Sequence, residues 1–112
     1  MAKYEAELTG DFNEILNKIE AGICAGSTTA SLEDGSDFAS YTNGARCAVR
    51  VFERYSYFGQ NRVSLNVTLF EADGRIRLSA ITSGGSQAMF VKINTIGEDA
   101  FIKKLIEIVE NL

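Results

Sequence analysis

Residues 61–80 read NRVSLNVTLFEADGRIRLSA, with apolar and polar side chains alternating on both sides of Asp73-Gly74. Alternation with a period of two is typical of strands that bury one face. Asp-Gly between two such runs is a strong signal for a two-residue hairpin turn. The stretch therefore predicts two antiparallel strands sharing one apolar face, formed by Val63, Leu65, Val67, Leu69, Ile76, Leu78 and Ala80.

Similar short extended runs surround this hairpin from residue 27 to residue 94. They are too closely spaced for parallel crossovers, so we expect further antiparallel hairpins. Their turns are predicted at Asp34-Gly35, Asn43-Gly44, residues 58–61 and Gly84-Gly85. We assign to the same apolar face Cys47, Val49 and Val51 from the preceding run, and Met89, Val91 and Ile93 from the following run.

Helical periodicity appears near both ends of the chain, after a first alternating strand at residues 3–10. Asp11, followed by Glu14, predicts an N-cap, and Gly22 or Gly26 predicts the end of that helix. Its apolar stripe is Phe12, Ile15, Leu16, Ile19 and Ile23. Thr95 and Glu98 match a capping box for a longer C-terminal helix, whose stripe is Phe101, Ile102, Leu105, Ile108, Val109 and Leu112.

The order of elements predicts an α+β protein with one domain, residues 1–112. We expect a single antiparallel curved sheet with an N-terminal helix and a long C-terminal helix packed on one face. This order resembles the helix-grip superfamily of the birch-pollen allergen and START domains, and also the TATA-binding-protein-like layout. The helix-grip resemblance implies a ligand between sheet and helices.

A closer resemblance comes from two runs, CAVRVFERYSYFGQNRVSLNVTLF and LSAITSGGSQAMFVKIN. They are similar to a family of small bacterial proteins of unknown function. This resemblance implies no activity, and it assigns no catalytic or binding residue.

Composition excludes several kinds of chemistry. The chain of 112 residues has no histidine, which removes Ser-His-Asp, Cys-His and zinc-histidine sites. Its formal charge of −4 disfavours nucleic acid as a partner. No apolar run is long enough for a membrane span and no signal peptide is visible, so we expect a cytoplasmic protein with Cys24 and Cys47 as reduced, buried thiols. We expect no metal and no cofactor.

The stretch ITSGGSQAMF, residues 81–90, looks at first like a phosphate-binding loop. A phosphate loop leads from a strand into a helix, whereas QAMFVKIN alternates and predicts a strand. We therefore interpret the glycine pair as a hairpin turn. The alternative is that polar side chains here form the rim of a ligand site, namely Thr82, Ser83, Ser86 and Gln87.

Two acidic features allow a functional and a structural interpretation. Glu33, Asp34 and Asp37 offer oxygen ligands for a cation, but their spacing does not match an EF-hand and favours a solvated turn. Alternation along the strand puts Glu53 on the side assigned to the core, which indicates a bulge or the end of the covered part of the strand. The alternative is a buried acid with a raised pKa.

The sheet face turned away from the predicted core is basic and aromatic. Strand parity places on it the candidate ligand or interface residues Arg50, Phe52, Arg54, Phe70, Arg77, Phe90 and Lys92. The face suits a solvated surface or a homodimer interface, an anionic small-molecule site, or single-stranded nucleic acid, the last being least favoured by the net charge. We expect a non-enzymatic binding or interaction module. An enzyme is the alternative class, although no catalytic residue can be named.

Overall fold

The hairpin at Asp73-Gly74 forms the centre of the sheet. The computed structural model describes residues 1–56, 61–84 and 91–112. Strand β4 (Asn61–Ala72) pairs antiparallel with β5 (Arg75–Gly84), and both turn residues have positive φ, 55° at Asp73 and 75° at Gly74. Two positive φ values define a type I′ turn, whose twist suits a tight hairpin. The predicted apolar face of this hairpin is confirmed, because every one of its seven residues is buried.

Three further strands complete an antiparallel sheet in the order β1-β5-β4-β3-β2. Strand β3 (Arg46–Ser56) pairs with β4, β2 (Ser31–Ala39) forms one edge, and β1 (Lys3–Leu8) pairs with β5 at the other edge. The turn predicted at Asn43-Gly44 joins β2 to β3, with Gly44 at a φ of 73°. The turn predicted at Asp34-Gly35 is wrong, because this dipeptide lies within β2, beside a shift of register between Leu32 and Asp34.

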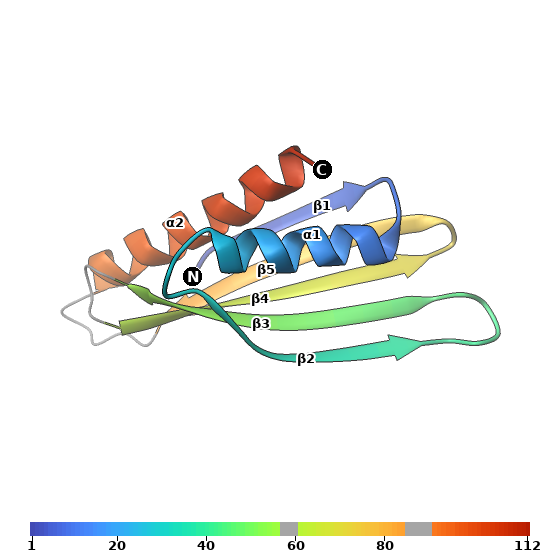
Figure 1. Ribbon diagram of the computed structural model, residues 1–112, viewed down its shortest axis with the longest axis horizontal. Coiled ribbons are helices and arrows are strands. Elements are labelled where there is room, and N and C mark those ends of the chain that lie inside the picture. The colour runs from blue at the N-terminus through green and yellow to red at the C-terminus, as the bar shows by residue number, and fades with distance from the viewer. Residues whose placement is uncertain (57–60, 85–90) are drawn as a thin grey trace.

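Both helices pack on one face of the sheet, as predicted (Figure 1). Helix α1 (Phe12–Ala25) begins after Asp11, whose side chain accepts a hydrogen bond of 3.0 Å from the backbone N–H of Glu14. Its predicted apolar stripe is buried throughout. The helix ends at Gly26 and continues through Gly22, where it approaches α2 closely: a Cβ at Gly22 would lie 2.7 Å from Cδ1 of Ile108.

Helix α2 (Val91–Glu110) begins earlier than the sequence predicts. The strand predicted before Thr95 is wrong at Val91 and Ile93, which are helical, while Met89 lies outside the described residues. Topology explains the difference: β5 already pairs with β4 on one side and β1 on the other, so no edge remains beside it for another strand. Thr95 and Glu98 consequently lie inside the helix and do not cap it.

The apolar stripe of the C-terminal helix is largely confirmed. Phe101, Ile102, Leu105 and Val109 are buried against the sheet and α1, Ile108 is partly buried, and Leu112 is exposed. In the described ranges, no helix has the length and apolar character needed to cross a bilayer. Both cysteines are free, as predicted, but they are not buried, since Cys24 is exposed and Cys47 is half-buried.

The assignment of faces in β3 is wrong. Cys47, Val49 and Val51 pair with Phe70, Thr68 and Asn66 of β4, on the side away from the helices. Ala48 and Phe52 are buried instead, opposite Leu69 and Leu65. We call the side under the helices the covered face. The opposite side is the open face, and its strand register assigns to it Lys3, Glu5, Glu7, Ser31, Asp34, Ser36, Phe38, Cys47, Val49, Val51, Glu53, Tyr55, Arg62, Ser64, Asn66, Thr68, Phe70, Ala72, Arg75, Arg77, Ser79, Ile81 and Ser83.

Candidate functional site

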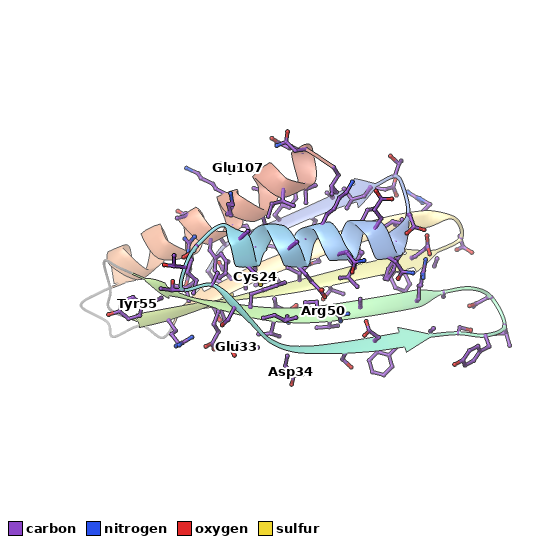
Figure 2. The ribbon with its side chains drawn as sticks, in the orientation of Figure 1. Cys24, Glu33, Asp34, Arg50, Tyr55 and Glu107 are labelled. Atoms are coloured by element: carbon purple, nitrogen blue, oxygen red, sulfur yellow. The ribbon has the colours of Figure 1, made fainter. Side chains whose placement is uncertain are left out.

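Arg50 links three elements on the covered face. It projects from β3 beneath α1 (Figure 2), and its side chain is only 12% exposed. Its Nε donates to Glu20 of α1 at 2.5 Å, and its terminal nitrogens contact both carboxylate oxygens of Asp37 on β2, at 3.0 and 3.2 Å. Nη1 also donates to the backbone carbonyl of Val49 at 2.9 Å. Arg50 therefore ties the edge strand β2 to the helix layer.

The surroundings of Arg50 keep its charge. Burial would lower the pKa of the guanidinium, but hydrogen bonds and charges from Asp37 and Glu20 outweigh burial and raise the pKa. Arg50 therefore remains cationic at neutral pH. Because Glu20 and Asp37 engage both ends of its guanidinium, we interpret Arg50 as a structural residue.

Arg46 lies four residues earlier on the same face of β3 and is engaged less completely. Its Nε donates to Glu71 of β4 at 2.9 Å, and its guanidinium lies 4.3 Å from the ring centroid of Phe12. The side chain is 32% exposed. Among the described residues, its two terminal nitrogens donate no hydrogen bond, whereas Nε does. Arg46 thus has charge-assisted donors left for a ligand.

These residues border a groove of about 700 Å³ between α1 and the β2–β3 hairpin. The turn of this hairpin extends beyond the N-terminal end of α1 (Figure 1). Helix α1 contributes Asn13, Leu16 and Asn17 to its lining, while Arg46 and Arg50 contribute from β3. The α1–β2 groove, as we call it, is also lined by Phe12, Asp37, Phe38, Ala39, Tyr41 and Cys47. A volume of this size is within the range of small-molecule sites, roughly 300 to 1,000 Å³.

The structure separates the residues predicted to form a basic aromatic face. Arg50, Phe52 and Arg54 lie on the covered face, with Phe52 fully buried. The guanidinium of Arg54 stacks 4.7 Å from the ring centroid of Phe101 on α2, and burial lowers its pKa. The prediction is wrong for these three residues because partners on α1, α2 and β2 compensate the arginines there.

Of the remaining predicted face residues, Phe70 and Arg77 are neighbours on the open face. They are 43% and 63% exposed, the second value being for the side chain. Lys92 lies in the first turn of α2, and Phe90 is outside the described residues. The predicted face therefore reduces to one aromatic and one basic residue.

The predicted rim also divides between the two faces. Thr82 is fully buried on the covered side, where its hydroxyl accepts a hydrogen bond of 3.0 Å from the N–H of Ala2. Ser83 is exposed on the open side, and its hydroxyl lies 2.8 Å from that of Ser64. Ser86 and Gln87 are outside the described residues. Thr82 and Ser83 therefore cannot line one common site.

The two acidic features have structural partners. Within the described ranges, no three potential ligands are arranged to hold a metal ion. Asp37 contacts Arg50, and Glu33 lies 3.5 Å from Arg62. Glu53 is on the open face, 3.3 Å from Arg62 and 34% exposed, so its prediction as a core-facing residue is wrong.

Sequence reasoning missed Arg46, Asn13 and Asn17, which line the groove. A signal for the asparagines was present, because positions 13 and 17 are four apart and share one side of a helix. Arg46 had no such signal, since its role depends on the face that β3 turns to α1.

The family model for DUF6054, a family of unknown function, matches residues 1–112. The chain belongs to this family. That result confirms the predicted resemblance to an uncharacterised family. Neither the curated proteins nor the solved structures contain a significant match, so the two fold resemblances stay predictions. For this member of DUF6054, function has to be argued from the groove and the sheet.

Proposed function

We propose that this DUF6054 protein is a non-enzymatic binding protein that takes a small, partly apolar organic acid in the α1–β2 groove. The observation that carries the proposal is the guanidinium of Arg46, which lines the groove with terminal donors that no described residue engages. A guanidinium fork matches a carboxylate in geometry and charge. The carboxylate of the ligand would bind there.

The other groove residues suit the remainder of such a ligand. Asn13 and Asn17 offer amide donors and acceptors from α1. Leu16 and the ring of Tyr41 offer apolar surface, and Tyr41 is fully exposed. Small-molecule sites typically combine a mostly apolar surface with a small number of polar groups. We also propose a cytoplasmic location, which the two free cysteines favour.

The arrangement supports binding more than catalysis. Apart from Arg46, the charged residues that line the groove, Arg50 and Asp37, are engaged with each other, and Arg50 also contacts Glu20. Proton transfer or nucleophilic attack needs a group that is available for reaction. The groove provides hydrogen bonds and shape, which are sufficient for recognition.

A calorimetric titration with matched ligand pairs tests this function. Each pair consists of a small aromatic or aliphatic carboxylic acid and its neutral carboxamide. We expect at least one acid to bind about tenfold or more tightly than its amide, since a charge-assisted hydrogen bond contributes about 1.5–3 kcal/mol. Arg46→Met should remove this preference while keeping the aliphatic packing on Phe12.

The matched control is Arg75→Met, an arginine on the open face whose partner is Glu7 at 2.7 Å. This variant should bind the acid as the wild type does. Failure of every acid to bind, or equal binding by the Arg46→Met protein, would exclude the proposed site. Native mass spectrometry of protein purified from its host provides the natural ligand for the same titration.

A further inference from the structure

The open face has an uncharged centre. Both helices lie on the other side of the sheet, so no described element covers it (Figure 1). A row is a set of residues that are paired across neighbouring strands. The three inner strands place six uncharged residues on the open face in two adjacent rows: Val51, Asn66 and Ile81 in one, and Val49, Thr68 and Ser79 in the other. Ile81 is 40% exposed, although it is a large apolar residue in the middle of the sheet. An uncharged centre surrounded by charged residues is typical of protein interfaces.

Opposite charges stand at the two ends of one row. The register runs from Lys3 of β1 through Ile81, Asn66 and Val51 to Asp34 of β2. Lys3 is exposed at one edge, where its ammonium lies 3.5 Å from Glu5 of the same strand. Asp34 points off β2 away from α1 at the other edge (Figure 2). The row is thus positive at one end, neutral in the middle and negative at the other end.

We propose that a second copy of this chain docks on the open face, with the two-fold axis parallel to β4. This rotation places β1 of each copy over β2 of the other, so that each Lys3 meets the Asp34 of the other copy. The interface is isologous, so the contact between Lys3 and Asp34 occurs twice. Sheets commonly stack face to face with their strands within about 30° of each other.

Charge selects this axis over the alternative. A two-fold axis across the strands would keep β1 over β1 and would bring Glu5, in the middle row, against itself. Like charges that face each other disfavour an interface. The axis along β4 instead places Glu5 over Ser36 of β2, which lies at the opposite end of that row.

The third row adds a second complementary contact. Arg77 lies on β5, and the same axis brings it over Cys47 on β3 of the other copy. Phe38, Cys47 and Phe70 line a hollow of about 290 Å³ at that position. The side chain of Arg77 is 63% exposed, and its contact with Glu7 is long, at 3.9 Å. In this position the guanidinium of Arg77 would lie between the rings of Phe38 and Phe70 of the other copy, and cation–π attraction would stabilise the contact.

Sedimentation equilibrium at several protein concentrations tests the proposal. We expect a wild-type dimer, and we expect Lys3→Glu to raise its dissociation constant about tenfold or more, because two rim contacts become repulsive. Asp34→Lys should have a similar effect. The double variant Lys3→Glu with Asp34→Lys should return the dissociation constant to within about threefold of wild type, since it only exchanges the two charges.

Two controls complete the experiment. Lys18→Glu and Glu107→Lys make the same changes in net charge on the outer sides of the helices, where both residues are exposed, and should leave the dimer intact. Thr68→Glu places like charges close to the axis and should dissociate the dimer while circular dichroism remains native. A monomeric wild type, or a double variant as weak as either single variant, would overturn the proposal. Arg46, which carries the proposed ligand contact, lies on the covered face, whereas Phe38 and Cys47 border both the groove and this interface. Ligand binding is therefore measured at a concentration where the protein is monomeric, so that the two proposals are tested separately.

Discussion

Two arginine–glutamate pairs on opposite faces of the sheet have similar geometry and different surroundings. Arg50 and Glu20 on the covered face lie 2.5 Å apart, with side chains 12% and 28% exposed. Arg75 and Glu7 on the open face lie 2.7 Å apart, with side chains 59% and 52% exposed. A short distance alone therefore does not show what a pair contributes. Water screens the exposed pair, whereas the covered pair joins β3 to α1, and Asp37 adds β2 to the same arginine.

The same contrast extends to aromatic residues. Phe52 is fully buried on the covered face, and Phe70 is 43% exposed on the open face. Phe52→Ala should lower the free energy of unfolding by about 3–5 kcal/mol, because it leaves a cavity in the core. Phe70→Ala should lower it by less than about 1 kcal/mol. Urea unfolding, followed by circular dichroism at a concentration where the protein is monomeric, measures both.

Equal losses for the two phenylalanine variants would contradict the assignment of faces in β3. Alternation in the sequence assigned Phe52 and Phe70 to the same face, so the two variants distinguish that assignment from the observed one. It also shows that a Phe52→Glu variant cannot probe an interface, since it would unfold the core.

A smaller effect is expected where the two helices meet above the covered face. Gly22→Val would place a Cβ 2.7 Å from Cδ1 of Ile108, and overpacking of this kind costs about 1–3 kcal/mol. Ala21→Val is the matched control, because Ala21 is exposed on the same helix. Its cost should stay near the helix propensity of valine, below about 0.7 kcal/mol. Thermal unfolding of both variants measures the difference, and equal melting temperatures would show that the helices do not meet at Gly22.

Local chemistry predicted the β4–β5 hairpin because two independent signals agree there. Asp73 and Gly74 suit a type I′ turn, and the alternation on either side places seven apolar residues on one face. Helix α1 was predictable for the same reason: Asp11 caps it, and its apolar stripe is continuous. In these two elements the turn or cap and the periodicity agree, and the structure follows both.

Strand β3 could not be assigned in this way, because both of its faces carry apolar residues. The choice depends on Arg50 and Arg54, which appear too polar for the covered face until Glu20, Asp37 and Phe101 are in place. These partners are distant in sequence. The α1–β2 groove was therefore missed together with the face of β3, because its lining depends on that face.

The start of α2 depended on topology. Val91-Lys92-Ile93-Asn94 alternates like a strand, but β1 occupies the free side of β5. Strand propensity is weak compared with such a constraint. The pairing of β1 with β5 joins residues about 75 positions apart, so no local pattern indicates it.

The central claim is that Arg50 on the covered face holds α1 to the sheet, whereas Arg75 on the open face contributes little to stability. Two parallel double-mutant cycles test it most directly, one with Arg50→Met and Glu20→Gln, the other with Arg75→Met and Glu7→Gln. From urea unfolding, we expect a coupling energy of about 1.5–2 kcal/mol for Arg50 with Glu20 and below about 0.5 kcal/mol for Arg75 with Glu7. Equal coupling energies, or a larger value for the open-face pair, would contradict the claim.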